Sequence, residues 1–273
     1  MVRILFLGDV FGNAGLDAVE RHVPALRDEL DLDLVLANGE NVAGGAGITA
    51  RLGTRLLAAG IDCLTLGNHT WRRDGTGSYL ASAERVVRPA NYLRTLPGRG
   101  MLTVPARDGT PVTVLNLLGR LTLEPACSPF EIVDRLAGEA LEASPVLIVD
   151  VHAEATSEKV AMGWFLDGRV TAVVGTHTHV PTADARVLPG GTAYVTDVGM
   201  TGARGGVIGV KKEQSIAVFR SHMPMRYDAS DIDPWLMAVV IRTAPGSSRA
   251  ESIESILRPE SSATNDSGRN QTR

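Results

Sequence analysis

The stretch TAVVGTHTH, residues 171–179, joins a short apolar run to two histidines. Its first five residues are typical of a strand that is buried on both faces, because they carry no charge and are mostly apolar. Similar runs recur along the chain and alternate with longer segments whose apolar residues follow a helical period. This alternation predicts an α/β protein in which helices cover the strands.

The short apolar runs are expected to form the strands. They lie at residues 3–7, 34–37, 63–66, 112–118, 146–151, 171–175, 192–196 and 237–242. Periodicity alone does not choose between one sheet and two packed sheets. No linker or repeat divides the chain, so residues 1–258 are expected to form a single domain. Residues 259–273 have no large apolar side chain and are expected to form a disordered C-terminal tail.

Three helices are indicated between the strands. The first follows strand 3–7, where Leu16, Val19, Val23, Leu26 and Leu30 form an apolar stripe. Pro24 is expected to kink or split this helix, because proline has no backbone N–H to donate. A second helix is expected at residues 49–59. A third should begin at Ser128, where Pro129 and Glu131 complete a sequence typical of a helix start.

The composition excludes several classes of protein. The chain has 273 residues, 44% hydrophobic and 21% charged, as in ordinary globular proteins. With 27 Lys and Arg against 31 Asp and Glu, no overall positive charge favours long nucleic acids or a membrane surface. Two cysteines are too few for a disulfide framework or a structural zinc site. The apolar run at the start is too short for a signal peptide, so a cytoplasmic location is expected.

Polar residues gather where the expected strands end. They are Asp9, Glu40, Asn41, Asn68, His69, His152, His177 and His179. Each alone could be a helix cap or a turn residue. Together they are better explained as a ligand site, because carboxyl ends of strands in α/β sheets meet at one edge. If the backbone is extended there, His177 and His179 would point the same way.

These donor types narrow the choice of metal. Carboxylate, carboxamide and imidazole without thiolate suit manganese, iron or zinc, and the share of oxygen donors favours iron or manganese over zinc or magnesium. The donors are too many for one ion. Two ions about 3.5–4 Å apart, sharing a carboxylate and a water, would use them all, as in many phosphoryl-transfer sites.

The motifs GDVFG, NGEN, TLGNH, GTHTH and DVGMTG, in this order, resemble the calcineurin-like metallophosphoesterase superfamily and its YmdB-like branch. The resemblance covers roughly residues 1–243. It implies a four-layer α/β/β/α sandwich of two mixed sheets flanked by helices. It also implies a hydrolase with two metal ions that acts as a phosphodiesterase on 2′,3′-cyclic nucleotides.

The resemblance also implies a role for each site residue. One metal would bind Asp9, Glu40, Asn41 and His179, and the other would bind Glu40, Asn68, His152 and His177. Glu40 would bridge the two ions, and His69 would be the general acid. The histidine of the superfamily's usual D-x-H opening is absent from Asp9-Val10-Phe11, and Asn41 is expected to replace it.

The expected mechanism uses a hydroxide between the metals, which attacks phosphorus in line while His69 protonates the departing ribose oxygen. The alternative for His69 is to orient Asn68 or Asp9. Two divalent ions against Asp9 and Glu40 leave a charge of about plus 2. One hydroxide and one diester monoanion bring this charge to zero, which favours a diester over a dianionic monoester.

Several alternatives remain open at this stage. Arg204, in a glycine-rich segment, and Arg72 are candidates for binding substrate, and Trp71 could stack on a base or pack in the core. The same metal pair would suit a phosphomonoesterase, nucleotidase or protein phosphatase. A regulatory metal-binding protein with little turnover is the alternative from another class. The expected partners are a small phosphodiester, short RNA ends, regulatory proteins or a second copy of the chain, and no membrane.

Overall fold

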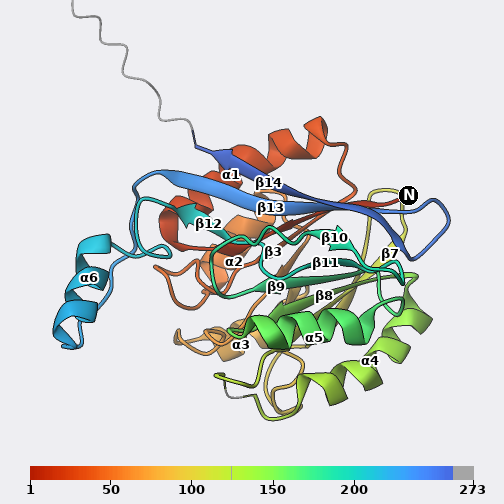
Figure 1. Ribbon diagram of the computed structural model, residues 1–273, viewed down its shortest axis with the longest axis horizontal. Helices are drawn as coiled ribbons and strands as arrows, with labels where there is room; N and C mark the ends of the chain where they lie inside the picture. Colours follow the sequence, from red (N-terminus) through yellow and green to blue (C-terminus); the bar gives the residue numbers. More distant parts are fainter. Residues whose placement is uncertain (124, 261–273) are drawn as a thin grey trace, which may run out of the picture.

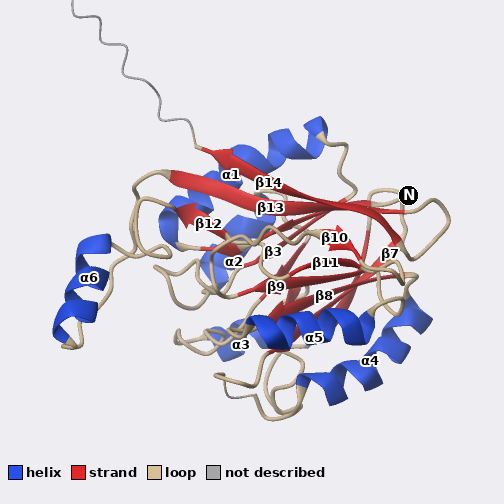
Figure 2. Cartoon of the chain, viewed as in Figure 1, coloured by secondary structure: helices blue, strands red, loops and turns tan. Residues whose placement is uncertain are grey.

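The computed structural model describes residues 1–123 and 125–260. Two β-sheets pack face to face, and helices cover their outer faces (Figures 1 and 2). This arrangement confirms the predicted four-layer α/β/β/α sandwich. Among the described residues, no helix is both long enough and apolar enough to span a membrane.

The first sheet contains the N-terminal strands. Its order is β2-β12-β13-β1-β3-β4-β5. Strand β14 lies off this path and also pairs with β13. The bounds are β1 (Arg3–Leu7), β2 (Asp9–Val10), β3 (Leu34–Asn38), β4 (Cys63–Thr65), β5 (Val86–Val87), β12 (Met200–Ala203), β13 (Pro234–Thr243) and β14 (Ala250–Pro259). Strands β1, β3, β4 and β5 run parallel, whereas β13 is antiparallel to β1, so the sheet is mixed.

The second sheet contains the middle of the chain. Its order is β10-β11-β9-β8-β7-β6. The bounds are β6 (Met101–Pro105), β7 (Pro111–Leu118), β8 (Val146–His152), β9 (Ala172–Thr176), β10 (Arg186–Val187) and β11 (Ala193–Val195). The central strands β7, β8, β9 and β11 are parallel, and both edge strands are antiparallel to their neighbours.

Side chains alternate between two layers of core, as the pleat of a strand requires. In β1, Ile4 and Phe6 lie in the core between the sheets, and Leu5 and Leu7 lie in the core beneath the helices. Because both faces are covered, these strands are continuous apolar runs rather than alternating ones. This explains why the sequence identified the central strands.

The helices divide between the two outer faces. Those of the first sheet are α1 (Gly12–Glu29) and α2 (Ala50–Ala58), and those of the second are α4 (Pro129–Ala143) and α5 (Thr156–Leu166). The short α3 (Thr76–Ser82) follows β4 along the chain. Helix α6 (Lys212–Ser221) stands apart from the body of the molecule (Figure 1).

Some local expectations need correction. Pro24 does not split α1, because the buried Val23 and Leu26 on either side keep the helix packed on the sheet. Ser128 is the N-cap of α4, as predicted, but its side chain makes no capping hydrogen bond. Strand β14 was not foreseen, because most of its side chains are exposed or only half-buried. It continues to Pro259, one residue past the predicted domain end, while residues 261–273 of the predicted tail lie outside the described residues.

The close approach of β9 and β11 leads to a prediction about stability. A Cβ atom at Gly175 would lie 1.8 Å from the backbone oxygen of Thr196, whereas one at Gly138 on α4 would meet nothing. We expect Gly175→Ala to lower the free energy of unfolding by about 1–3 kcal/mol, as overpacking does. The control Gly138→Ala should raise it by about 0.5–1 kcal/mol through helix propensity. Urea unfolding of both variants measures this, and equal midpoints would refute the steric argument.

Candidate metal centre

Strand ends from both sheets converge on one site. Asp9 lies just after β1, Glu40 and Asn41 follow β3, and Asn68 and His69 follow β4 in the first sheet. His152 ends β8, and His177 and His179 follow β9 in the second sheet. All the residues predicted from the strand ends therefore come together, although they belong to two sheets rather than to one edge.

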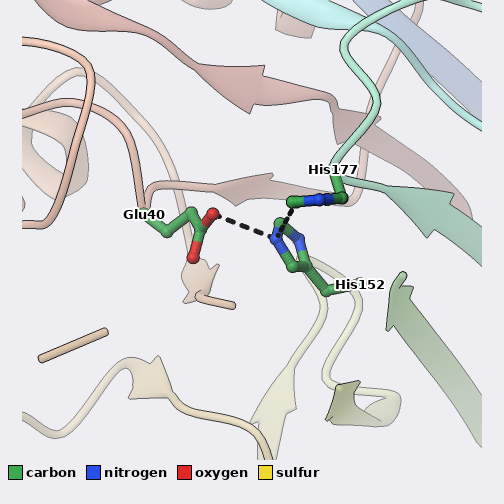
Figure 3. A group of neighbouring side chains, drawn as sticks. All are labelled: Glu40, His152 and His177. Carbon is green, nitrogen blue, oxygen red and sulfur yellow. Dashed lines mark hydrogen bonds and ion pairs between the residues drawn. The ribbon is translucent and has the colours of Figure 1, made fainter. Parts of the chain in front are cut away.

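Glu40 occupies the middle of this group. Its side chain is fully buried, and its Oε2 accepts a hydrogen bond of 2.7 Å from the backbone N–H of His69. Its Oε1 lies 3.0 Å from His152 Nε2 but makes no hydrogen bond with any described residue. His177 Nδ1 lies 3.0 Å from the same nitrogen of His152, so the three side chains face one another (Figure 3). One donor atom from each lies within 4.8 Å of the others, which suits a metal ion.

The remaining donors form two further sets of contacts. Asn68 Oδ1 is 2.9 Å from His152 Nε2. Asn41 Nδ2 is 3.3 Å from Asp9 Oδ1 and 3.1 Å from His179 Nε2. These two groups correspond to the two ligand sets that the family resemblance implies.

Burial and the neighbouring charges shift the pKa values of three residues in the cluster. Burial alone would raise the pKa of the Glu40 carboxyl, but the nearby His152 and His69 lower it to about 2. Burial opposes the charge on His152, yet Glu40 and Asp9 raise its pKa to about 9. Burial and the charge of His152 together lower the pKa of His177 to about 3. The carboxylate thus needs positive charge beside it, and His177 is held neutral, as a metal ligand must be.

Asp150 positions His152, a role that sequence reasoning missed. Thr176 Oγ1 donates to Asp150 Oδ1 over 2.7 Å and lies 2.8 Å from His152 Nδ1. A hydroxyl that donates to Asp150 accepts from His152 Nδ1–H, so Nε2 is the nitrogen that faces Glu40, and a bound metal ion would replace the proton that the raised pKa of His152 keeps there. Asn116 also donates to Asp150, and burial raises the pKa of this carboxyl to about 6. A charged residue inside the apolar strand β8 was the available signal.

Asp197 holds the loop that carries the last two histidines. This loop is not extended, as had been considered, because the φ angles of His177 and His179 are 99° and 66°. Between them, the amide and hydroxyl of Thr178 both donate to Asp197 Oδ2, at 3.1 and 2.7 Å. The buried Lys159 pairs with the same oxygen at 2.7 Å. The two imidazoles converge because this clamp fixes a strained loop, rather than because of strand geometry.

A cavity of about 540 Å³ opens beside the candidate metal ligands. His69, His177 and His179 line it, and His69 Nδ1 lies 2.6 Å from Asn41 Oδ1. Much of the remaining wall is apolar, and sequence reasoning did not identify it. This apolar wall consists of Phe11, Val207, Ile208, Val210, Phe219 and Tyr227.

The structure does not bring the other substrate candidates to this cavity. The Arg204 guanidinium lies 4.5 Å above the Trp235 ring and lines a neighbouring pocket. Arg72 is exposed and is not part of the cavity wall. Trp71 packs against the core beneath the helices, and its ring lies 6.1 Å from the Tyr92 ring. Of its two expected roles, this position favours packing in the core over stacking on a base.

Comparison with known proteins identifies relatives of this chain. A family model described as "YmdB-like protein" matches residues 5–256. The 2′,3′-cyclic-nucleotide 2′-phosphodiesterase of Bacillus subtilis (strain 168) is 44% identical over 256 residues, covering 94% of this chain and 97% of that protein.

Solved structures give the same picture. A hypothetical protein from Thermus thermophilus matches with a TM-score of 0.89 and 42% identity, covering 95% of this chain and all of that one. A novel phosphatase from Mycoplasma pneumoniae matches with a TM-score of 0.88 and 34% identity, over 94% and 93% of the two chains.

The position of Glu40 predicts that metal binding depends on its charge. Glu40→Gln keeps the size of the side chain but removes its negative charge beside His152 and His177. We expect the purified variant to hold less than about one metal ion per chain where the wild type holds about two. Metal analysis of the purified proteins measures this.

Glu158→Gln is the matched control for this variant. Glu158 is also buried, but its carboxylate accepts from the backbone N–H groups of Arg120 and Leu121 and lies outside the donor cluster. It should retain the wild-type metal content. A Glu40→Gln variant with the same content, or a folded wild type with at most one ion, would contradict a shared carboxylate.

Proposed function

The chain belongs to the family of YmdB-like proteins, and we propose that it is a metal-dependent phosphodiesterase that hydrolyses 2′,3′-cyclic nucleotides. The observation that carries this proposal is the buried Glu40 carboxylate, whose Oε1 lies 3.0 Å from His152 Nε2 in a cluster with His177 that has the donor spacing of a metal site. The name of the Bacillus subtilis relative supports the substrate class.

We propose that two metal ions bind at this centre. Asp9, Asn41 and His179 would hold one, Asn68, His152 and His177 the other, and Glu40 would hold both. Iron or manganese fits the mixture of oxygen and imidazole donors without thiolate, with zinc or magnesium as the alternatives. When bound, the ions neutralise charge on the phosphate and activate water for attack on phosphorus.

His69 supplies the proton in this proposal. Its Nδ1–H donates to Asn41 Oδ1, and the side chain lines the cavity, so Nε2 is the nitrogen available to a bound ligand. Burial lowers the pKa of His69, while the nearby Glu40 carboxylate opposes this shift. The net shift favours the neutral imidazole, so in this proposal the negative charge of a bound phosphate would favour the imidazolium that protonates the departing ribose oxygen.

The apolar wall supports a nucleotide as substrate. Phe219 and Tyr227 are 75% and 42% exposed beside a polar metal centre, although large apolar side chains are usually buried. A nucleobase stacked on these rings would cover apolar surface while its phosphate faces the metal donors. Among the lining residues from α6, only the buried Ser215 is polar, so this helix would contact the base mainly through the ring of Phe219.

We also propose a cytoplasmic location, because Cys63 and Cys127 are both free thiols. The sequence-based expectations of a homo-oligomer, of short RNA ends as further substrates and of regulatory partners stay predictions.

Replacement of His69 tests the assigned acid. His69→Ala should lower kcat for 2′,3′-cyclic AMP by about 10²–10⁴-fold, the usual contribution of a general acid, while retaining both metals. His22→Ala, on α1 outside the cavity, should keep the wild-type rate. Steady-state kinetics with 2′,3′-cyclic AMP, 3′,5′-cyclic AMP and a phosphomonoester measure the effect.

Each outcome separates the hypotheses. Full activity in His69→Ala would mean that another group donates the proton. Preference for the monoester would favour the phosphomonoesterase or protein phosphatase alternative. A wild type that holds two metals and hydrolyses none of the substrates would favour the regulatory alternative.

The apolar wall predicts a change in KM. Tyr227→Ala and Phe219→Ala should each raise KM for 2′,3′-cyclic AMP by about 5–100-fold with kcat little changed, because stacking on one ring contributes about 1–3 kcal/mol. Tyr227→Phe keeps the ring and should behave like wild type. Ile216→Ala is the control, because Ile216 is an exposed apolar residue on α6 that does not line the cavity. Equal KM values in Ile216→Ala and Phe219→Ala would contradict base stacking.

A further inference from the structure

A second pocket of about 270 Å³ lies beside α4 and shares no lining residue with the metal-centre cavity. Four arginines line it, and we call it the arginine pocket. Arg88, Arg94 and Arg99 come from the segment between β5 and β6, and Arg135 comes from α4. The only acidic residue in its lining is Glu139. A charge of plus 3 therefore surrounds a small space in a chain whose net charge is minus 4.

Arg88 is a buried cation without a carboxylate partner. Arg88 is only 4% exposed, and its guanidinium forms no ion pair with any described residue. Its guanidinium instead donates to the backbone oxygens of Pro89, Pro97, Leu93 and Leu96. Carbonyl oxygens satisfy the N–H groups but leave the positive charge uncompensated, and an uncompensated buried charge is costly.

Arg94 and Arg99 add exposed positive charge at the same pocket. Neither guanidinium makes a hydrogen bond or an ion pair within residues 1–123 and 125–260, unlike several other arginines on the surface. Arg55, Arg169 and Arg242, for example, pair with carboxylates at 2.7–2.8 Å. Arg135 is 3.6 Å from Glu139, and both side chains are exposed, so this pair neutralises little of the local charge.

Arg88 also shapes the segment that presents the other two arginines. Its four backbone acceptors span residues 89–97, which contain Arg94 and end shortly before Arg99. The guanidinium thus holds the segment folded around itself. Arg94 and Arg99 are therefore anchored on a fixed loop, opposite Arg135 on a helix, and the pocket they line does not need to form on binding.

We propose that the arginine pocket binds a phosphate dianion, either free or as the phosphate of a nucleoside monophosphate. Guanidinium groups match the geometry of phosphate oxygens and form strong charge-assisted hydrogen bonds with them. A dianion neutralises more of the pocket charge of plus 3 than a single carboxylate does. It also supplies the negative charge that Arg88 lacks. This site is separate from the metal centre, and the proposal does not depend on the proposed function.

The test compares two double variants of the metal-loaded protein. Arg94→Gln/Arg99→Gln removes two charges from the arginine pocket, and both side chains are exposed, so the fold should be retained. Arg51→Gln/Arg186→Gln removes two exposed arginines that line neither pocket and form no ion pair with a described residue. Inorganic phosphate and adenosine 5′-monophosphate are titrated into each protein by isothermal calorimetry, and the unfolding temperature is followed in parallel.

We expect the wild type to show a phosphate-binding event that weakens by about tenfold or more in Arg94→Gln/Arg99→Gln and stays unchanged in the control. Hydrolysis at the metal centre should be equal in all three proteins. Binding of phosphate alone that is weakened in Arg94→Gln/Arg99→Gln would identify the free ion as the ligand of the arginine pocket. Tighter binding of the monophosphate that is weakened in the same variant would identify a nucleotide, because binding at the metal centre would be equal in all three proteins. Unchanged binding in Arg94→Gln/Arg99→Gln, or equal weakening in the control, would overturn the proposal.

Discussion

The buried carboxylate of Glu40 is the constraint on which the site depends. An anion removed from water needs positive charge close by, or its burial costs several kcal/mol. One oxygen of Glu40 is satisfied by the amide of His69, while the other faces the imidazole nitrogens of His152 and His177. The strand ends of both sheets are therefore organised around a position where a cation is favourable.

Buried residues behind the imidazoles hold them in orientations that suit metal ligands. Asp150, through Thr176, holds Nδ1 of His152, so that Nε2 is the nitrogen that faces Glu40. Asp197 and Lys159 hold a loop with positive φ angles, which would be strained in isolation. These buried groups contact no substrate in our proposal, yet they set the direction of each donor.

The net charge of the chain is small, yet its polar, apolar and positively charged side chains gather in separate places. The metal centre is a polar cluster, and the cavity beside it has the apolar wall that includes Phe219 and Tyr227. The arginine pocket concentrates positive charge elsewhere on the chain. Composition gives the chain no overall positive charge, but a total charge says nothing about how charges are distributed in space.

Local patterns in the sequence were sufficient for the central strands, and they singled out the polar residues that the fold brings together in the candidate metal centre. Strands such as β1 and β8 are buried on both faces, so their apolar runs are continuous, and the polar residues that follow them mark the strand ends. The exposed edge strand β14 has no such signal, because backbone pairing with β13 rather than side-chain burial holds it in place.

Only the tertiary structure decided that two sheets, rather than one, deliver the donors. It also revealed the apolar wall, the clamp on the loop of His177 and the convergence of Arg88, Arg94 and Arg99 on Arg135 of α4. The physical reason is that the chemistry of a side chain follows from its residue type alone, whereas the distance between two side chains depends on packing between segments that lie far apart in the chain. A motif can therefore identify a candidate ligand residue, but the fold sets the direction of that side chain and the residues around it.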